Sequence, residues 1–205
     1  MLAFTMLLLV GGCATEEDAV SGTTDPVSGT AGTRAMATGS RPVDAIPVVH
    51  TPLGGYGRTM PPPVLSGCVD PLVSGAPDLR GMWRVVEVES EGQVDPHHRA
   101  LGHVQRVEQC GDRLVVTAGG VVHDMRVDGT EENGVHDVAE LDYATPITVV
   151  ATYEDGVHVL RPKGLPIEVT RRREGDQMVW TYLGFTARLE RLGPPEMDPP
   201  PDEEA

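Results

Sequence analysis

Basic side chains are scarce in this chain, which has 16 lysines and arginines against 31 aspartates and glutamates among 205 residues. The formal net charge of -15 argues against a nucleic-acid partner, because such partners are bound largely by Lys and Arg that neutralise phosphates. The same charge opposes adsorption to an anionic lipid surface through a basic patch. We therefore exclude nucleic acid, and any residence at a membrane must come from another feature.

The usual signatures of an enzyme are also missing. Serine occurs mainly before residue 78, no Gly-x-Ser-x-Gly nucleophile motif is present, and no glycine-rich loop has the spacing of a phosphate cradle. Neighbouring acids such as Glu131 and Glu132 are typical of a solvated surface. We expect no enzymatic activity, no cofactor and no metal, with a hydrolase or isomerase as a remote alternative.

The chain begins with a short apolar run, MLAFTMLLLV at residues 1–10, which is too short to span a bilayer and has the length of a secretory signal segment. The run Val10-Gly11-Gly12-Cys13 resembles the lipobox of bacterial lipoproteins, in which small residues precede a cysteine that is diacylated after cleavage. The resemblance implies a signal peptide at 1–12 and a lipid anchor at Cys13. An ordinary signal peptide with an incidental cysteine is the alternative.

The residue after the anchor carries information about sorting. Ala14 stands where many inner-membrane lipoproteins of Gram-negative bacteria have Asp, so the resemblance implies delivery to the outer membrane, on its periplasmic side or its surface. The protein would then be a lipid-anchored component of the cell envelope whose protein partner is unknown.

Cysteine is rare, with three in the chain. Once Cys13 is assigned to the anchor, Cys68 and Cys110 remain as a pair in an oxidising compartment, and we predict a disulfide between them. It would close a loop of about 43 residues and stabilise the fold by about 4 kcal/mol on the chain-entropy model.

After the predicted signal peptide at 1–12, composition divides the chain into three further parts. The segment 13–77 is rich in Gly, Ser, Thr and Pro without a sustained period, which predicts a disordered tether. Residues 194–205 combine proline with acids and predict a disordered tail. Between them, residues 78–193 hold short runs of Val, Thr, Ile and aromatics that end in turn pairs such as Asp128-Gly129 and Asn133-Gly134.

This pattern predicts an all-β fold, a small antiparallel meander barrel of about 8–10 short strands, since an open sheet of this size would leave sticky edges. Alternation places Val121, His123 and Met125 on one face of their strand and Val122 and Asp124 on the other, which we expect to be solvated. The predicted strands cover 82–89, 103–109, 113–118, 121–127, 135–141, 147–153, 157–161, 166–173, 177–183 and 185–191.

The entry into the first strand, Gly81-Met82-Trp83, resembles the Gly-x-Trp opening of lipocalins and related calycin barrels. In that superfamily the Trp plugs one end of the barrel and an Arg from the last strand packs across it. The resemblance implies this role for Trp83, with Arg188 or Arg191 as the arginine. Barrels of this size are either filled by side chains or hold one small ligand.

Five side chains are candidates for lining a pocket: Trp83, His123, Arg171, Trp180 and Tyr182. His123 lies on the apolar face of its strand and needs a partner, which is more often a core group or backbone carbonyl than a ligand. Arg171 shares parity with inward residues and could face an anionic amphiphile, or belong to a solvated arginine run. The aromatic side chains are few, and the alternative for them is a place in the hydrophobic core rather than in a pocket lining.

Three histidines, His97, His98 and His103, crowd one loop, but their spacing matches no zinc pattern and a solvated loop is preferred. The preferred function is a lipid-anchored envelope protein whose barrel binds a small apolar or amphiphilic molecule. The alternative is a structural or interaction lipoprotein with a solid-packed barrel that docks an envelope protein.

Overall fold

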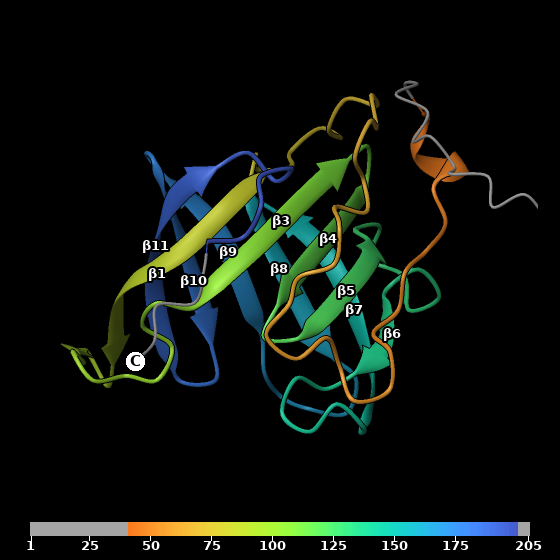
Figure 1. The fold of residues 1–205 in the computed structure, drawn as a ribbon. Coiled ribbons are helices and arrows are strands. Elements are labelled where there is room, and N and C mark those ends of the chain that lie inside the picture. The colour runs from red at the N-terminus through yellow and green to blue at the C-terminus, as the bar shows by residue number, and fades with distance from the viewer. Residues whose placement is uncertain (1–40, 201–205) are drawn as a thin grey trace, which may run out of the picture. The chain divides into compact units, whose positions relative to one another are not determined.

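The computed structural model describes residues 41–200, which form a nearly closed antiparallel β-barrel (Figure 1). Each predicted strand range overlaps an observed strand, and the two-residue strand β2 is the addition. The elements are η1 (Val43–Ala45), β1 (Gly81–Ser90), β2 (Gln93–Val94), β3 (Val104–Cys110), β4 (Arg113–Ala118), β5 (Val121–Arg126), β6 (Val135–Val138), β7 (Pro146–Glu154), β8 (Val157–Pro162), β9 (Val169–Glu174), β10 (Gln177–Tyr182) and β11 (Phe185–Gly193).

The strands follow one another round the barrel as an up-and-down meander. Their order is β5-β4-β3-β1-β11-β10-β9-β8-β7-β6, with β2 attached to β1, and the first and last long strands pair antiparallel. Between the edge strands β5 and β6, the Arg126 amide donates to the Asn133 carbonyl at 2.7 Å. The predicted all-β barrel is therefore confirmed. Among residues 41–200 no helix has the length and apolarity needed to cross a membrane.

The connections gather at two ends of the barrel. One end, which we call the mouth, consists of loop 95–103 and the connections at 119–120, 139–145, 163–168 and 183–184. The other end is closed by Trp83, which is fully buried and whose Nε1 donates to the Leu79 carbonyl at 2.8 Å. Apolar side chains from all the long strands fill the interior between this end and the mouth.

Two arginines lie at the plug: Arg191, one of the two expected, is paired with Trp83 across β11 and β1, and Arg173 of β9 is the second. The Arg173 guanidinium lies 4.9 Å from the centre of the Trp83 ring. Arg188 points outward to the carboxylate of Glu174, and Arg191 donates to a backbone carbonyl beside the barrel end. Arg173 reaches the ring because it shares inward parity with Arg171 on β9, and Arg188 does not reach it because it alternates with the inward residues of β11.

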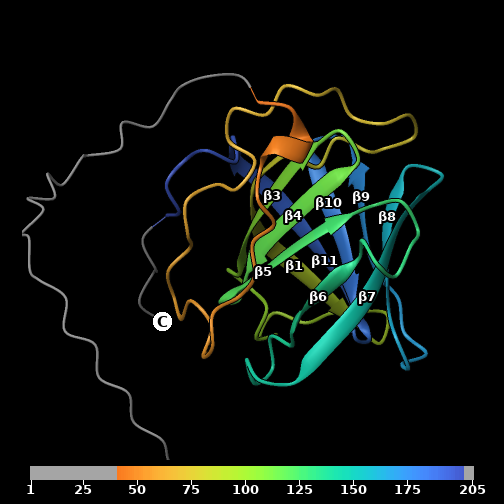
Figure 2. The same ribbon diagram turned by 90° about the vertical axis from the view of Figure 1, so that its right-hand side faces the viewer.

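The segment predicted to be a tether as far as residue 77 packs, in its described part, against the outside of the barrel. Residues 41–67, which we call the strap, run beside β4 and β5 (Figure 2). Val43 and Ile46 of the strap cover Val115 and Val122, both fully buried. The outer face of β4 and β5, expected to be solvated, is thus a second small core.

Buried charge fastens the strap to this face. Arg113 and Asp124 form an ion pair at 2.6 Å, and their side chains are 3% and 1% exposed. The Arg113 guanidinium donates to the carbonyls of Ile46 at 2.6 Å and Pro47 at 2.8 Å, while Asp124 accepts from the Val49 amide at 3.0 Å. The pair therefore supplies hydrogen bonds to backbone groups of the strap, as a neighbouring strand would do.

Two further carboxylates continue this pattern. Glu108 accepts from the amides of Val64 at 3.1 Å and Leu65 at 2.6 Å, and Asp137 accepts from the Thr51 amide at 2.9 Å. Burial raises the pKa of Glu108, and the hydrogen bonds from the two backbone amides partly offset this increase. Side chains that look like solvated charge in the sequence are thus the acceptors for the strap.

The predicted disulfide is confirmed. Cys68, which follows the strap, is bonded to Cys110 at the end of β3, with Cα atoms 6.1 Å apart. Within residues 41–200 these sulfurs and Asp70 are the one close group of potential metal ligands. Because both sulfurs are in the disulfide, they are not available as thiolates.

The ends of the chain are described in part. Of the acidic tail predicted to be disordered, residues 194–200 are described, and the Met197 carbonyl accepts from Arg106 at 3.4 Å. Residues 201–205 lie outside the described residues, as do the predicted signal peptide and the anchor Cys13.

Candidate functional site

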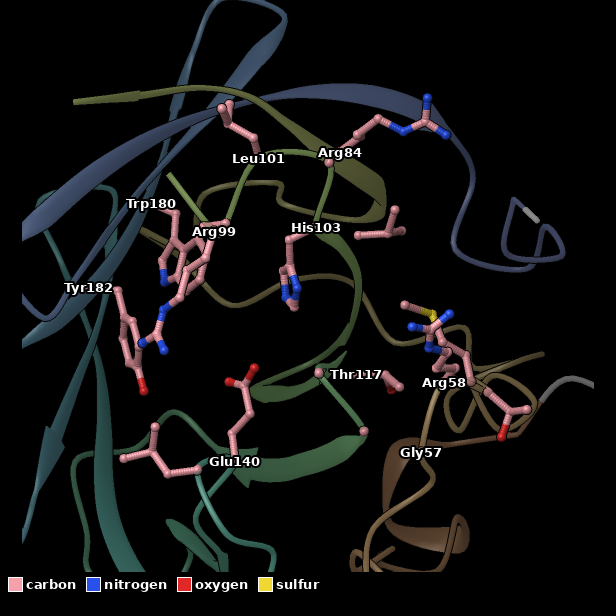
Figure 3. Close-up of a pocket in the computed structure, with 18 of the residues that line it drawn as sticks. Gly57, Arg58, Arg84, Arg99, Leu101, His103, Thr117, Glu140, Trp180 and Tyr182 are labelled. Atoms are coloured by element: carbon pink, nitrogen blue, oxygen red, sulfur yellow. The ribbon is translucent and has the colours of Figure 1, made fainter. Parts of the chain in front are cut away.

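A partly open cavity of about 1250 Å³ lies at the mouth of the barrel. It has two arms on either side of His103 (Figure 3). The inner arm enters the barrel and is lined by Trp180, Tyr182, Phe185 and Glu140, and the outer arm lies between the strap and the outer face of the sheet. The barrel is therefore packed at the plugged end and hollow at the mouth.

Aromatic rings form one wall of the inner arm. Trp180 and Tyr182 alternate inward on β10 and stack with centroids 5.3 Å apart, and Phe185, after the turn, meets Trp180 edge-on at 5.3 Å. His103 stacks on Trp180 from the loop at 5.9 Å. Such a wall offers apolar contact to a ligand and keeps its own geometry through ring packing.

A buried positive charge lies behind this wall. Arg171 is directly opposite His158 and Trp180 on the neighbouring strands, and its guanidinium is 5.6 Å from the Trp180 ring centre. Its Nε donates to Gln105 Oε1 at 3.1 Å. Burial lowers the pKa of Arg171 to about 10, with opposing contributions from the charges of Glu140 and Tyr182, so the group remains cationic at neutral pH.

The interior around Arg171 contains N–H donors that lack acceptors. Several buried nitrogens have no hydrogen-bond partner within residues 41–200: His103 Nε2, Gln105 Nε2, Arg171 Nη1, Trp180 Nε1 and both ring nitrogens of His158. A buried polar group without a partner costs free energy. Water or a ligand with acceptor oxygens would relieve this cost.

One carboxylate opposes the positive charge. Glu140 lines the inner arm, and Figure 3 shows its side chain directed into the cavity below His103. Burial raises the pKa of Glu140, while the charges of Arg171 and Arg99 lower it. The inner arm therefore carries positive and negative groups together.

The five candidates from the sequence fall in different places. Trp180 and Tyr182 line the cavity, and Arg171 lies behind Trp180. Trp83 is at the plugged end, away from the cavity lining. His123 Nε2 lies 3.3 Å from the Val138 carbonyl, which is the backbone partner considered for it, and burial lowers its pKa.

The histidine loop holds a residue that the sequence did not assign to the pocket. His103 lines the cavity against Trp180, whereas His98 packs its ring on Phe185 at 4.5 Å and accepts from the Ala100 amide at 3.2 Å. The strap residues Gly57–Met60 were also missed, because they lie in the segment predicted to be a tether. Only the fold brings them to the mouth.

The buried His158 predicts a pH dependence of stability. Burial, with the Arg171 charge, lowers the pKa of His158 to about 3, whereas the ordinary value is about 6.5. In the unfolded chain His158 is therefore protonated below about pH 6.5, whereas in the folded chain it stays neutral down to about pH 3. The free energy of unfolding consequently falls as the pH falls through this window. We expect His158 to account for a loss of about 3 kcal/mol in the free energy of unfolding between about pH 7 and pH 4.

Denaturant titrations of His158→Leu at these two pH values test this expectation. The variant should lose less stability than the wild type on acidification, by about the stated amount, while His97→Leu, at an exposed position, should follow the wild type. Equal losses in the wild type and His158→Leu would show that His158 does not titrate in this way.

The protein is thus an antiparallel barrel with a partly open cavity at its mouth. No family model matches the chain, and no curated protein matches it. Among solved structures seven chains match, and one of them, human cRBP IV, is 18% identical with a TM-score of 0.43, over 56% of this chain and 98% of that chain. The strand order, rather than this likeness, defines the barrel.

Proposed function

We propose that the barrel binds a small apolar or amphiphilic molecule in the mouth cavity. The observation that carries the proposal is the cavity itself, which has about 1250 Å³ over its two arms and so has room for a small ligand. Its inner arm joins an aromatic wall to buried donors without partners, and this combination suits a molecule with an apolar body and an oxygen-bearing group. A solid-packed barrel would lack the inner arm.

We further propose that the chain is exported and anchored through a lipid on Cys13, in the envelope of a Gram-negative bacterium. The lipobox-like run before Cys13 supports this, and the disulfide is in keeping with an oxidising compartment. The anchor would keep the mouth cavity close to a source of lipid-like molecules.

Mass spectrometry of the full chain purified from cell membranes tests both parts. Native spectra in mild detergent should show a stoichiometric small-molecule passenger, and the N-terminal peptide should begin at Cys13 with the added mass of acyl chains. Denaturing extraction then identifies the passenger. A bare barrel, even after incubation with an envelope lipid extract, would overturn the binding function, and an unmodified Cys13 would overturn the anchor.

A pair of variants links the passenger to the cavity. Ala100 lines the cavity and Ala144 is exposed in another mouth loop outside the lining, so Ala100→Trp fills the cavity and Ala144→Trp is its matched control. We expect passenger occupancy to fall about ten-fold in Ala100→Trp alone, as the loss of one good apolar subsite would produce. Equal occupancy in both variants would place the passenger elsewhere.

A further inference from the structure

The exposed leucines of this protein gather at the mouth of the barrel. Among residues 41–200 four leucines are exposed: Leu53 by 96%, Leu141 by 72%, Leu165 by 58% and Leu183 by 47%. Three of them belong to the mouth connections at 139–145, 163–168 and 183–184. Figure 1 shows these connections, with the turn of the strap, at the lower end of the barrel. We call the four side chains the rim leucines.

The fourth rim leucine, Leu53, reaches the mouth through the strap. The Gly55 amide donates to the Pro52 carbonyl at 2.9 Å, so Leu53 lies in a tight turn. The next amide, that of Tyr56, donates to the Gly120 carbonyl at 2.8 Å, in the mouth connection between β4 and β5. The strap therefore adds its own exposed leucine to the rim.

The backbone at Leu183 is a second, independent observation. Its φ is 41°, in the left-handed region, where a leucine is strained and where a two-residue turn prefers asparagine, aspartate or glycine. The two-residue turn at 155–156, at the plugged end, has Asp155 in the same position with a φ of 49°. A leucine that is both strained and nearly half exposed does not stabilise the barrel, which indicates a contact outside the chain.

Charge at the rim is mixed. Exposed acids and bases lie in the same mouth segments as the leucines: Glu91, Asp142 and Glu168, with Arg99 and Lys163. No basic patch is present among these residues to attract an anionic lipid surface. The partner that suits exposed leucines with such surroundings is therefore apolar beneath a surface without net charge.

We propose that the rim leucines dock the mouth of the barrel on a bilayer of zwitterionic phospholipid, so that the cavity, which Leu141 also lines, opens toward the lipid. Leucines on separate loop tips suit a bilayer, since each can insert between lipids by itself, whereas a protein partner favours one continuous apolar patch. This inference rests on the proposed residence of the chain at a membrane, and it does not depend on a ligand in the cavity.

Tryptophan reporters on the full chain test the docking. Leu165→Trp places a reporter at the mouth, and Asp176→Trp places its matched control in an exposed turn at the plugged end. Each variant, purified from cell membranes, is reconstituted in phosphatidylcholine vesicles with and without bromine near the headgroup end of the acyl chains. Relative to the wild type, we expect bromine to quench about half or more of the fluorescence added by Leu165→Trp and none of that added by Asp176→Trp.

The contribution of a rim leucine is tested with Leu183→Asn, read by the Leu165→Trp reporter. Asn-Gly suits a two-residue turn, so the denaturation midpoint should not fall. Docking should weaken about ten-fold, as the loss of one inserted leucine allows, and the quenching should fall with it. Val69→Asn removes an exposed valine beside the disulfide, away from the rim, and should keep the quenching.

The other outcomes contradict the docking in different ways. Chains that stay with the vesicles while both reporters or neither are quenched would have no preferred face, and the proposed anchor would stand. Full quenching in Leu183→Asn would overturn the role of the leucines. A blue-shifted Leu165→Trp emission without bromine quenching would assign the rim to a protein partner or a second copy. Chains that leave the vesicles would overturn the anchor as well.

Discussion

Replacing Arg113 with methionine is expected to lower the free energy of unfolding by about 3–5 kcal/mol, because the change leaves the carboxylate of Asp124 buried without its cation. The strap carbonyls of Ile46 and Pro47 lose their donor at the same time. Chemical denaturation of Arg113→Met and the wild type measures the difference.

Two comparisons make the result specific. Lys163→Met breaks an exposed ion pair with Glu131 and should cost less than about 1 kcal/mol. The double variant Arg113→Met with Asp124→Leu, which removes both charges, should cost less than the sum of its single variants. A cost for Arg113→Met as small as that of Lys163→Met would show that the pair does not hold the strap.

The disulfide is expected to contribute about 4 kcal/mol. Cys68 and Cys110 are 42 positions apart, and closing such a loop removes much conformational freedom from the unfolded chain. The double variant Cys68→Ala with Cys110→Ala should therefore unfold at clearly lower denaturant than the wild type. Reduction of the wild type with a thiol should have the same effect on the denaturation midpoint.

The control for the disulfide is reduction of the alanine variant, which should leave its denaturation midpoint unchanged. A wild-type midpoint that does not move on reduction would contradict the expected contribution. Because the strap ends immediately before Cys68, faster proteolysis within residues 41–67 after reduction would show which segment the bond holds.

Much of the barrel could be predicted, because strands and turns leave local signals. The alternation of Val121, His123 and Met125 and the turn pairs between strands depend on neighbouring residues alone. The pairing of Cys68 with Cys110 followed from counting cysteines. The plugging position of Trp83 followed from a short motif at the start of β1, but the second arginine beside it, Arg173, depends on how β9 faces the interior.

The candidate site could be predicted only in part. Trp180 and Tyr182 have inward parity on one strand, and this is visible in the sequence. Arg84 and Thr117 line the cavity together with strap residues Gly57–Met60, and nothing near them in the chain indicates this. Contacts between distant segments have no local period.

The sequence by itself determined the strand pattern, the disulfide and the acidic character of this protein, since each depends on composition or on residues close together in the chain. The tertiary structure alone decided that residues 41–67 fold onto the barrel and that the mouth is hollow. The physical reason is that the strap is held by single buried side chains and backbone hydrogen bonds to distant carboxylates, and that a cavity depends on how side-chain volumes add up in three dimensions.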